Sequence, residues 1–388
     1  MGMRRKRICI LGSTGSIGRN SLRVIEGLKD RFEVSGLSAQ TNISLLVEQV
    51  KRFRPKAISI GDKTKLCRLP ASIRRNTRVF SGREGAEELA ARKESDIVLI
   101  AISGSASIRP TYKAVSAGKT VALASKEALV SAGHIITEEA RKKRSTIIPV
   151  DSEHSAVFQC LSGNDISRVS RFYITASGGP LWNIPKSRFK NLSPKEVLRH
   201  PKWNMGKKIS VDSATMMNKG LELIEAKWLF GIDIGRIEVL VHPEAVVHSM
   251  VEFLDGSVMA QLGITDMRLP IQYALSHPYR FESGLEPLDL AAIGKLSFFR
   301  PDPGKFPSLR LAYEAAKEGG SATAVLNSSN EAAVKAFLDG KIRFPDIPRV
   351  IERILSSHKR IGSPSMEDLD HIERWTKIEV ERFCSYRS

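Results

Sequence analysis

The fold of the first part of this chain is decided by the stretch Arg7-Ile8-Cys9-Ile10-Leu11-Gly12-Ser13-Thr14-Gly15-Ser16-Ile17-Gly18. Its first five residues predict a short apolar strand, and a helical pattern follows the glycines. A glycine turn between a strand and a helix is the context of a dinucleotide-binding fingerprint, because the backbone can approach a pyrophosphate at the helix N-terminus. The alternative is a tight turn without a ligand. The candidate cofactor contacts are Gly12, Ser13, Thr14, Gly15, Ser16 and Ile17.

Strand-like and helix-like segments alternate through the first 150 residues. Alternation of this kind predicts a parallel, doubly wound sheet of the Rossmann type, in an α/β protein. The predicted strands are residues 7–11, 32–37, 57–60, 96–102, 120–123 and 146–150, and helical segments such as 43–53 and 109–117 lie between them.

The end of the second predicted strand bears on the choice of cofactor. An NAD enzyme usually has an acidic residue there, which binds the ribose 2′-hydroxyl. This chain has Gln40 and Asn42 in that turn and no acidic residue, so the sequence favours NADP, although no arginine or lysine is present either. Ser125, Lys126 and Glu127 follow a later strand and are further candidate contacts. From spacing alone, Lys126 is equally well a surface lysine at a helix start.

Two carboxylates stand directly after the last strand of this region, in Val150-Asp151-Ser152-Glu153-His154-Ser155. At a strand end, Asp151 and Glu153 are expected to project toward one site. Two close carboxylates repel each other unless a positive charge lies between them, and a divalent cation commonly supplies it. The sequence therefore predicts a metal site here.

Two loops of the central region suggest ligand binding. The turn at Ser177 continues with two glycines and a proline, and its amides and hydroxyl suit a phosphate, unless it is an ordinary glycine turn. The segment 200–206 contains His200, Trp203 and Gly206, which suggests a loop that covers a site; a tryptophan that anchors the loop to the core is the alternative.

The run from Val211 to Ala226 places several polar groups at helical spacing. Asn218, Lys219 and Glu222 share one helix face, because they are three and four residues apart. A solvated salt bridge is the plain interpretation, but the neighbouring residues are apolar. Glu222 is a candidate third carboxylate beside Asp151 and Glu153, and three carboxylates without cysteine predict Mg²⁺ or Mn²⁺ rather than zinc.

Composition sets limits on the whole chain. At 388 residues it is expected to form two or three domains. We expect no membrane segment and no signal peptide, and the four scattered cysteines indicate a reducing compartment, such as the cytoplasm. The net charge of +18 raises the possibility of nucleic-acid binding, but the basic residues are spread out, so attraction of anionic small molecules is favoured.

Several of these motifs together resemble the 1-deoxy-D-xylulose 5-phosphate reductoisomerase family. The resemblance is carried by residues 150–156, the Ser-Gly-Gly-Pro turn, the His-Pro-x-Trp-x-Met-Gly loop and above all residues 208–222, and it runs in order over nearly the whole chain. Ser125, where an asparagine is common, and the segment 39–42, which lacks a usual glycine and lysine, depart from the family pattern.

The resemblance implies an NADPH- and metal-dependent conversion of a ketose phosphate to 2-C-methyl-D-erythritol 4-phosphate in isoprenoid precursor synthesis. It implies an NADP-binding domain at 1–150, a catalytic α+β domain at 151–276, a connector at 277–306, a C-terminal helical bundle at 307–388, and a homodimer. The implied metal ligands are Asp151, Glu153 and Glu222. The implied catalytic residues are Lys126, Glu153 and His200. The implied substrate contacts are Ser152, Glu153, Ser177, His200, Trp203, Ser213, Asn218, Lys219 and Glu222. Met205 and Gly206 are implied cofactor contacts, in the same flap as Trp203.

Two other functions are alternatives to this one. A metal-independent NADP dehydrogenase, such as a semialdehyde dehydrogenase, needs a catalytic cysteine, and Cys160 has no supporting motif. An NADP-sensing binding protein without turnover would leave the three carboxylates unexplained. In the tail, Leu369, Ile372 and Ile378 are expected to form the buried stripe of the last helix, and Ser365 with Asp368 to start it as a capping box.

Overall fold

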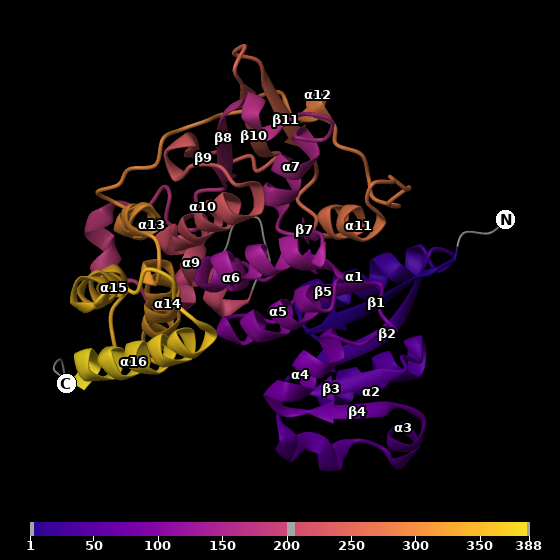
Figure 1. The fold of residues 1–388 in the computed structure, drawn as a ribbon. Coiled ribbons are helices and arrows are strands. Elements are labelled where there is room, and N and C mark those ends of the chain that lie inside the picture. Colours follow the sequence, from indigo (N-terminus) through magenta and orange to yellow (C-terminus); the bar gives the residue numbers. More distant parts are fainter. Residues whose placement is uncertain (1–3, 200–205, 386–388) are drawn as a thin grey trace. The chain divides into compact units, whose positions relative to one another are not determined.

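The computed structural model describes residues 4–199 and 206–385 (Figure 1). The chain divides into two compact units. Unit 1 consists of Met1–Ala128, His134–Ser155 and Asp266–Glu286. Unit 2 consists of Leu129–Gly133, Ala156–Thr265 and Pro287–Ser388.

Unit 1 is built on a seven-stranded sheet in which every strand pairing is parallel. The strand order is β4-β3-β2-β1-β5-β6-β7, so the chain starts in the middle and builds outward in both directions. The strands are β1 (Lys6–Leu11), β2 (Phe32–Ala39), β3 (Ala57–Ile60), β4 (Arg78–Ser81), β5 (Ile97–Ile100), β6 (Thr120–Leu123) and β7 (Ile147–Pro149). The prediction of a doubly wound sheet is confirmed, and β4 is a strand that the sequence pattern did not reveal.

The helices of unit 1 cover both faces of this sheet (Figure 1). Right-handed crossovers that run outward in opposite directions from a central strand place their helices on opposite faces. Accordingly, α4 and α5 pack together, and α1 packs with α11. The helices are α1 (Ser16–Gly27), α2 (Ile43–Phe53), α3 (Ala71–Asn76), α4 (Gly82–Ala90), α5 (Ile108–Ser116), α6 (Glu127–Lys143) and α11 (Arg268–Ser276). Residues Leu129–Gly133 of α6 are assigned to unit 2.

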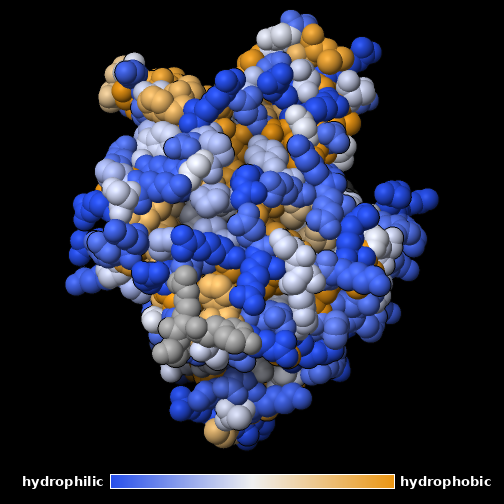
Figure 2. Space-filling model, turned by 90° about the vertical axis from the view of Figure 1, so that its left-hand side faces the viewer, coloured by the Kyte–Doolittle hydropathy of each residue, from blue (hydrophilic) through white to orange (hydrophobic). Residues whose placement is uncertain are grey.

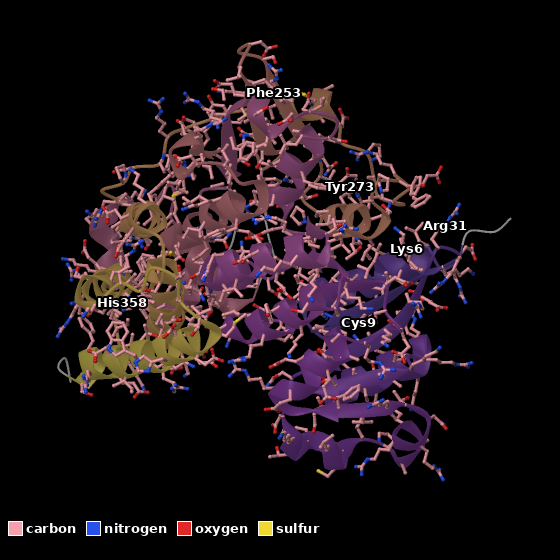
Figure 3. The ribbon with its side chains drawn as sticks, in the orientation of Figure 1. Lys6, Cys9, Arg31, Phe253, Tyr273 and His358 are labelled. Atoms are coloured by element: carbon pink, nitrogen blue, oxygen red, sulfur yellow. The ribbon has the colours of Figure 1, made fainter. Side chains whose placement is uncertain are left out.

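The central strand β1 is anchored at its start. The backbone amide of Lys6 donates to the carbonyl of Arg31, and the two residues lie side by side in Figure 3. The guanidinium of Arg7 donates to both carboxylate oxygens of Asp96, at 2.8 and 3.1 Å, and these hydrogen bonds lower the pKa of Asp96. Cys9 follows inside the sheet, where burial raises its thiol pKa to about 12. These contacts fix β1 beside β5, which places the glycine turn at the carboxyl edge of the sheet.

Unit 2 contains a second, mixed sheet of four strands in the order β11-β10-β8-β9. Strands β8 and β9 are parallel, and β10 is antiparallel to both β8 and β11. A hairpin turn at Asp255 and Gly256 joins β10 to β11, and Gly256 has the positive φ of +83° that such a turn requires. The strands are β8 (Val169–Ala176), β9 (Ile237–Val241), β10 (Val247–Phe253) and β11 (Val258–Leu262).

The other regular elements described in unit 2 are helices. Helix α7 (Ser152–Cys160) contains the boundary between the units, and α10 packs against α13 while α14 packs against α15 and α16. The predicted C-terminal bundle is therefore present. The helices are α8 (Pro194–Val197), α9 (Lys207–Thr215), α10 (Met217–Phe230), α12 (Leu290–Ile293), α13 (Pro307–Glu318), α14 (Ala322–Leu338), α15 (Asp346–Ser357) and α16 (Met366–Ser385).

The buried stripe of α16 differs from the predicted one at its C-terminal end. Leu369 and Ile372 are buried, but Ile378 is 49% exposed. Because 378 is six residues after 372, it falls on a different face of a 3.6-residue helix, and Thr376 and Val380 continue the buried stripe instead. The predicted capping box at Ser365 and Asp368 is confirmed, since the backbone amide of each donates to the other's side chain. Within the described residues, every helix is too short or too polar to cross a membrane.

Candidate active site

The glycine turn between β1 and α1 is shaped by close backbone contacts. Gly12 has a φ of +87°, and a Cβ atom there would lie 2.3 Å from the carbonyl oxygen of Ala101, just beyond the neighbouring β5. A Cβ on Gly18 would lie 2.3 Å from the carbonyl oxygen of Gly12. Gly15 is exposed, and a Cβ atom on it would lie 3.4 Å from the carbonyl oxygen of Gly12. Two glycines are thus needed by the protein's own packing, while the third leaves room for a ligand.

Polar side chains hold this turn in place from β2 and α2. The hydroxyl of Ser38 accepts a hydrogen bond from the backbone amide of Gly12 at 2.9 Å. The buried Ser13 hydroxyl donates to Gln49 at 2.7 Å, and the Gln49 amide donates back to the carbonyl oxygen of Ser13 at 2.9 Å. The turn therefore has its shape before any ligand arrives, and it lies where the strand order reverses between β1 and β5, the usual place for a nucleotide in such sheets.

The turn after β2 places the two candidate NADP contacts differently. Asn42 caps α2, because its side-chain oxygen accepts a hydrogen bond from the amide of Leu45 at 3.2 Å. Gln40 lies against Gly61, whose ideal Cβ would fall 1.9 Å from the Gln40 side-chain oxygen. Both residues thus have structural partners within unit 1. Their contact with a cofactor remains a prediction.

Ser125 and Lys126 follow β6 in the described structure. The Ser125 hydroxyl lies within hydrogen-bond distance of two carbonyl oxygens at the end of β5, those of Ile100 (3.2 Å) and Ile102 (2.6 Å). The Lys126 ammonium lies 2.5 Å from a carboxylate oxygen of Asp151, and both side chains are largely buried. Lys126 is thus no ordinary surface lysine, because burial of its charge depends on this ion pair.

The position of Glu153 corrects one expectation. Strand β7 ends at Pro149, and the helix α7 begins at Ser152, so Glu153 lies in the first turn of a helix rather than at a strand end. The backbone amide of Ser155 already donates to the carbonyl of Asp151 at 2.8 Å. A carboxylate in the first turn is favoured by the helix dipole. The Ser152 hydroxyl donates to the Glu153 carboxylate at 2.5 Å.

The second group of candidates belongs to unit 2, on the helix α10. As predicted, Asn218, Lys219 and Glu222 share one face. The Asn218 amide donates to one oxygen of Glu222 at 2.6 Å, and the Lys219 ammonium lies 2.5 Å from the other. The Glu222 carboxylate is buried, with 1% of its side chain exposed. The alternative of a solvated salt bridge is therefore wrong.

The serine–glycine turn after β8 lies against the helix that precedes α10. Gly178 and Gly179 have φ values of +83° and +66°, and a Cβ on Gly179 would lie 2.6 Å from the carbonyl oxygen of Ser213 and 3.0 Å from its hydroxyl. The Ser177 hydroxyl accepts a hydrogen bond from the amide of Gly179 at 3.3 Å. Unit 2 thus brings Ser177 and Ser213 into one neighbourhood. His200, Trp203 and Met205 lie outside the described residues, and Gly206 is the exposed residue that precedes α9.

The competing function with a catalytic cysteine is disfavoured by the state of Cys160. This thiol is buried at the end of α7, and burial raises its pKa to about 11. A nucleophilic cysteine needs a lowered pKa and access to substrate. Cys160 has neither property.

The chain is similar to known proteins in sequence and in structure. Family models match three parts of the chain: "1-deoxy-D-xylulose 5-phosphate reductoisomerase" at residues 8–133, "1-deoxy-D-xylulose 5-phosphate reductoisomerase C-terminal domain" at 147–230, and "DXP reductoisomerase C-terminal domain" at 262–379. Proteins described as 1-deoxy-D-xylulose 5-phosphate reductoisomerase are similar over the whole length. The one from Caldanaerobacter subterraneus is 46% identical over 97% of this chain and 99% of its own, and the one from Chloroherpeton thalassium is 50% identical over 97% of each.

Solved structures with the same description share the fold. The Zymomonas mobilis protein in complex with NADPH aligns with a TM-score of 0.92 at 41% identity, over 98% of this chain and 99% of that one. A structure of DOX-P reductoisomerase with NADPH, fosmidomycin and magnesium aligns with a TM-score of 0.92 at 38% identity, over 98% of both chains.

Proposed function

The chain belongs to the family of 1-deoxy-D-xylulose 5-phosphate reductoisomerases, and we propose that it uses Asp151, Glu153 and Glu222 as the metal ligands of this reaction. It is an NADPH- and divalent-metal-dependent oxidoreductase that isomerises and reduces 1-deoxy-D-xylulose 5-phosphate to 2-C-methyl-D-erythritol 4-phosphate, in the non-mevalonate pathway of isoprenoid precursor synthesis. The observation that carries the residue assignment is that Asp151 and Glu153, both in unit 1, offer carboxylate oxygens within 4.8 Å of each other.

The donor set fits a hard cation. All three ligands offer carboxylate oxygens, which Mg²⁺ and Mn²⁺ prefer, and a related structure contains magnesium. When bound, the ion polarises the substrate carbonyl and stabilises negative charge on oxygen. The largely buried ion pairs Lys126–Asp151 and Lys219–Glu222 orient their carboxylates. Ser152 orients Glu153 by its hydrogen bond.

The phosphate of the substrate is assigned to the turn and helix of unit 2. Asn218 and Lys219 lie in the first turn of α10, where backbone amides and the helix dipole favour an anion. Ser177 and Ser213 supply hydroxyls nearby. Lys219 would then exchange the Glu222 carboxylate for a phosphate while Glu222 takes the cation, so that both buried charges stay compensated.

The remaining assignments concern the cofactor and the reacting carbons. NADPH supplies the hydride, and the glycine turn from Gly12 to Ile17 is placed to bind its pyrophosphate. Lys126 and His200 are assigned to groups near the substrate hydroxyls, and the segment with Trp203 and Met205 to a flap that excludes water. We assign cofactor binding to residues 1–150, catalysis to 151–276, a connecting role to 277–306 and support to 307–388, in a cytoplasmic enzyme.

Removal of the metal is expected to abolish the reaction. NADPH absorbance should fall after addition of 1-deoxy-D-xylulose 5-phosphate and Mg²⁺ or Mn²⁺, and the fall should stop when EDTA is added. The control is NADPH binding, followed by its fluorescence, which should persist in EDTA because the glycine turn lies in unit 1 and contains no proposed metal ligand. Turnover that continued in EDTA would refute the metal assignment. If the protein binds NADPH but shows no turnover with added metal, the function would be refuted.

A homodimer is proposed from an exposed edge of the second sheet. Strand β11 is an edge strand within the described part of the chain, and Val258 and Met259 on it are 50% and 46% exposed. Leu254, in the preceding hairpin turn, is 66% exposed. Figure 2 shows hydrophobic surface at the top of the view, where Figure 1 places the β10–β11 hairpin and α12. An apolar edge strand is a template for pairing with another chain.

Replacement of Val258 by lysine is expected to dissociate this dimer, because a charge on an apolar edge opposes pairing. Light scattering after size-exclusion chromatography should give twice the chain mass for the wild type and the single mass for Val258→Lys. Ile378→Lys is the matched control, since Ile378 is equally exposed, at 49%, but lies on α16. A monomeric wild type would contradict the dimer, whereas a dimeric Val258→Lys would contradict only the choice of edge.

A further inference from the structure

A buried carboxylate in α9 is held by a residue of the C-terminal bundle. Asp212 is 1% exposed, and one of its oxygens accepts a hydrogen bond from the side-chain amide of Asn330 on α14, at 2.8 Å. Its other oxygen lies 2.8 Å from the Lys208 ammonium, one turn earlier on α9. A buried carboxylate is tolerated only when its oxygens are bonded in this way. The Lys208 contact lies within α9, so the hydrogen bond from Asn330 is the one that fixes α9 against α14.

Ser213, which follows Asp212 in α9, is in close contact with the serine–glycine turn. Gly179 approaches the carbonyl oxygen and the hydroxyl of Ser213 so closely that no Cβ fits between them. Packing this tight leaves little room for adjustment, so a shift of α9 would move the turn with it. The position of Ser177, which is bonded to the amide of Gly179, follows from the position of α9.

The same helix also determines where α10 begins. Helix α9 ends at Thr215, and Met216, in the left-handed conformation with a φ of +59°, leads directly into α10. Asn218 and Lys219 follow within the first turn of α10. A single short helix, with one anchor from α14, therefore sets the position of both groups that are assigned to the substrate phosphate.

We propose that Asn330 and Asp212 are positioning residues for the phosphate-binding groups Ser177, Ser213, Asn218 and Lys219. This inference rests on the phosphate assignment under the proposed function. The C-terminal bundle then contributes indirectly to substrate binding. The neutral amide of Asn330 completes the hydrogen bonding of Asp212 without adding charge, and Asp212 keeps α9 in position against the serine–glycine turn. Neither residue touches the substrate in this proposal.

Alanine at position 330 is expected to weaken phosphate binding specifically. Loss of a buried hydrogen bond to a charged group should raise the KM for 1-deoxy-D-xylulose 5-phosphate about tenfold. The inhibition constant of inorganic phosphate against this substrate should rise by a similar factor, while the dissociation constant of NADPH stays unchanged. The matched control is Asn327→Ala, because Asn327 is also buried on α14 but its amide bonds Glu331, on the same helix. It should lower thermal stability and leave both phosphate-dependent constants near wild type.

A reciprocal exchange tests the pair itself. Asp212→Asn alone should show the same loss as Asn330→Ala, and the double variant Asp212→Asn with Asn330→Asp should recover part of it, because an amide again faces a carboxylate across the two helices. Inorganic phosphate that fails to compete in the wild type would refute the phosphate assignment. If inorganic phosphate competes equally well in the wild type and in folded Asn330→Ala, the positioning role alone is overturned. The same holds if Asn327→Ala shows the same loss of phosphate affinity as Asn330→Ala.

Discussion

Replacement of Glu222 by glutamine is expected to lower turnover by at least about a hundredfold, because even residues that only support a metal ligand contribute about 10–100-fold. Glutamine keeps the shape of the side chain and its contact with Asn218, but it removes the negative charge that a divalent cation requires. NADPH absorbance after addition of substrate and Mg²⁺ measures the effect. The dissociation constant of NADPH should remain near wild type, because Glu222 and the glycine turn belong to different units.

The same variant has a second expected effect that identifies the role of Lys219. In the wild type this largely buried ammonium is compensated by Glu222 at 2.5 Å. Breaking a buried ion pair costs about 3–5 kcal/mol, so Glu222→Gln should unfold at a lower temperature than the wild type. Inorganic phosphate should restore part of the lost stability, because it offers Lys219 a new negative partner.

A surface glutamate provides the control for Glu222→Gln. Glu238 pairs with Arg171 at 3.3 Å at a partly exposed position of the second sheet, where an ion pair contributes little. Glu238→Gln should therefore keep both turnover and stability. Near-normal turnover of Glu222→Gln would show that Glu222 is not a metal ligand. If Glu222→Gln is destabilised and inorganic phosphate does not restore its stability, Lys219 does not belong to the phosphate site.

Local patterns in the sequence predicted several features that depend on neighbours along the chain. The strand–glycine–helix order predicted the first turn of the sheet, and the spacing of Asn218, Lys219 and Glu222 predicted their shared face. Both are consequences of backbone geometry over a few residues. The expectation that Glu153 lies at a strand end was wrong for an equally local reason. An acidic residue also favours the first turn of a helix, and Glu153 lies in the first turn of α7.

Contacts between distant residues could not be predicted in this way. Asn330 and Asp212 are 118 residues apart, and nothing in a helix of small residues marks one asparagine as the partner of a buried aspartate. The pairing of Lys126 with Asp151 is similar, since spacing alone left Lys126 equally consistent with a surface position. In both cases burial decides the interpretation, and burial depends on how the helices pack.

The three glycines of the first turn are expected to respond differently to alanine. At Gly12 and Gly18 the new Cβ would overlap a backbone oxygen at 2.3 Å, and at Gly12 the φ of +87° adds strain. Such overpacking costs about 1–3 kcal/mol or more, so Gly12→Ala and Gly18→Ala should lower the unfolding temperature without any ligand. NADPH affinity should fall with it, because the turn loses its shape.

Gly15→Ala separates ligand binding from folding. Gly15 has a φ of −75°, which alanine adopts readily, and its Cβ would stay 3.4 Å from the oxygen of Gly12, so the apo protein should keep its unfolding temperature. A methyl group at this exposed position would nevertheless stand where the pyrophosphate approaches the start of α1. NADPH affinity, measured by fluorescence titration, should then fall at least about tenfold, as expected when an anion is held away from backbone amides. Unchanged affinity in Gly15→Ala would place the pyrophosphate elsewhere, whereas unchanged stability in Gly12→Ala and Gly18→Ala would refute the packing argument for the turn.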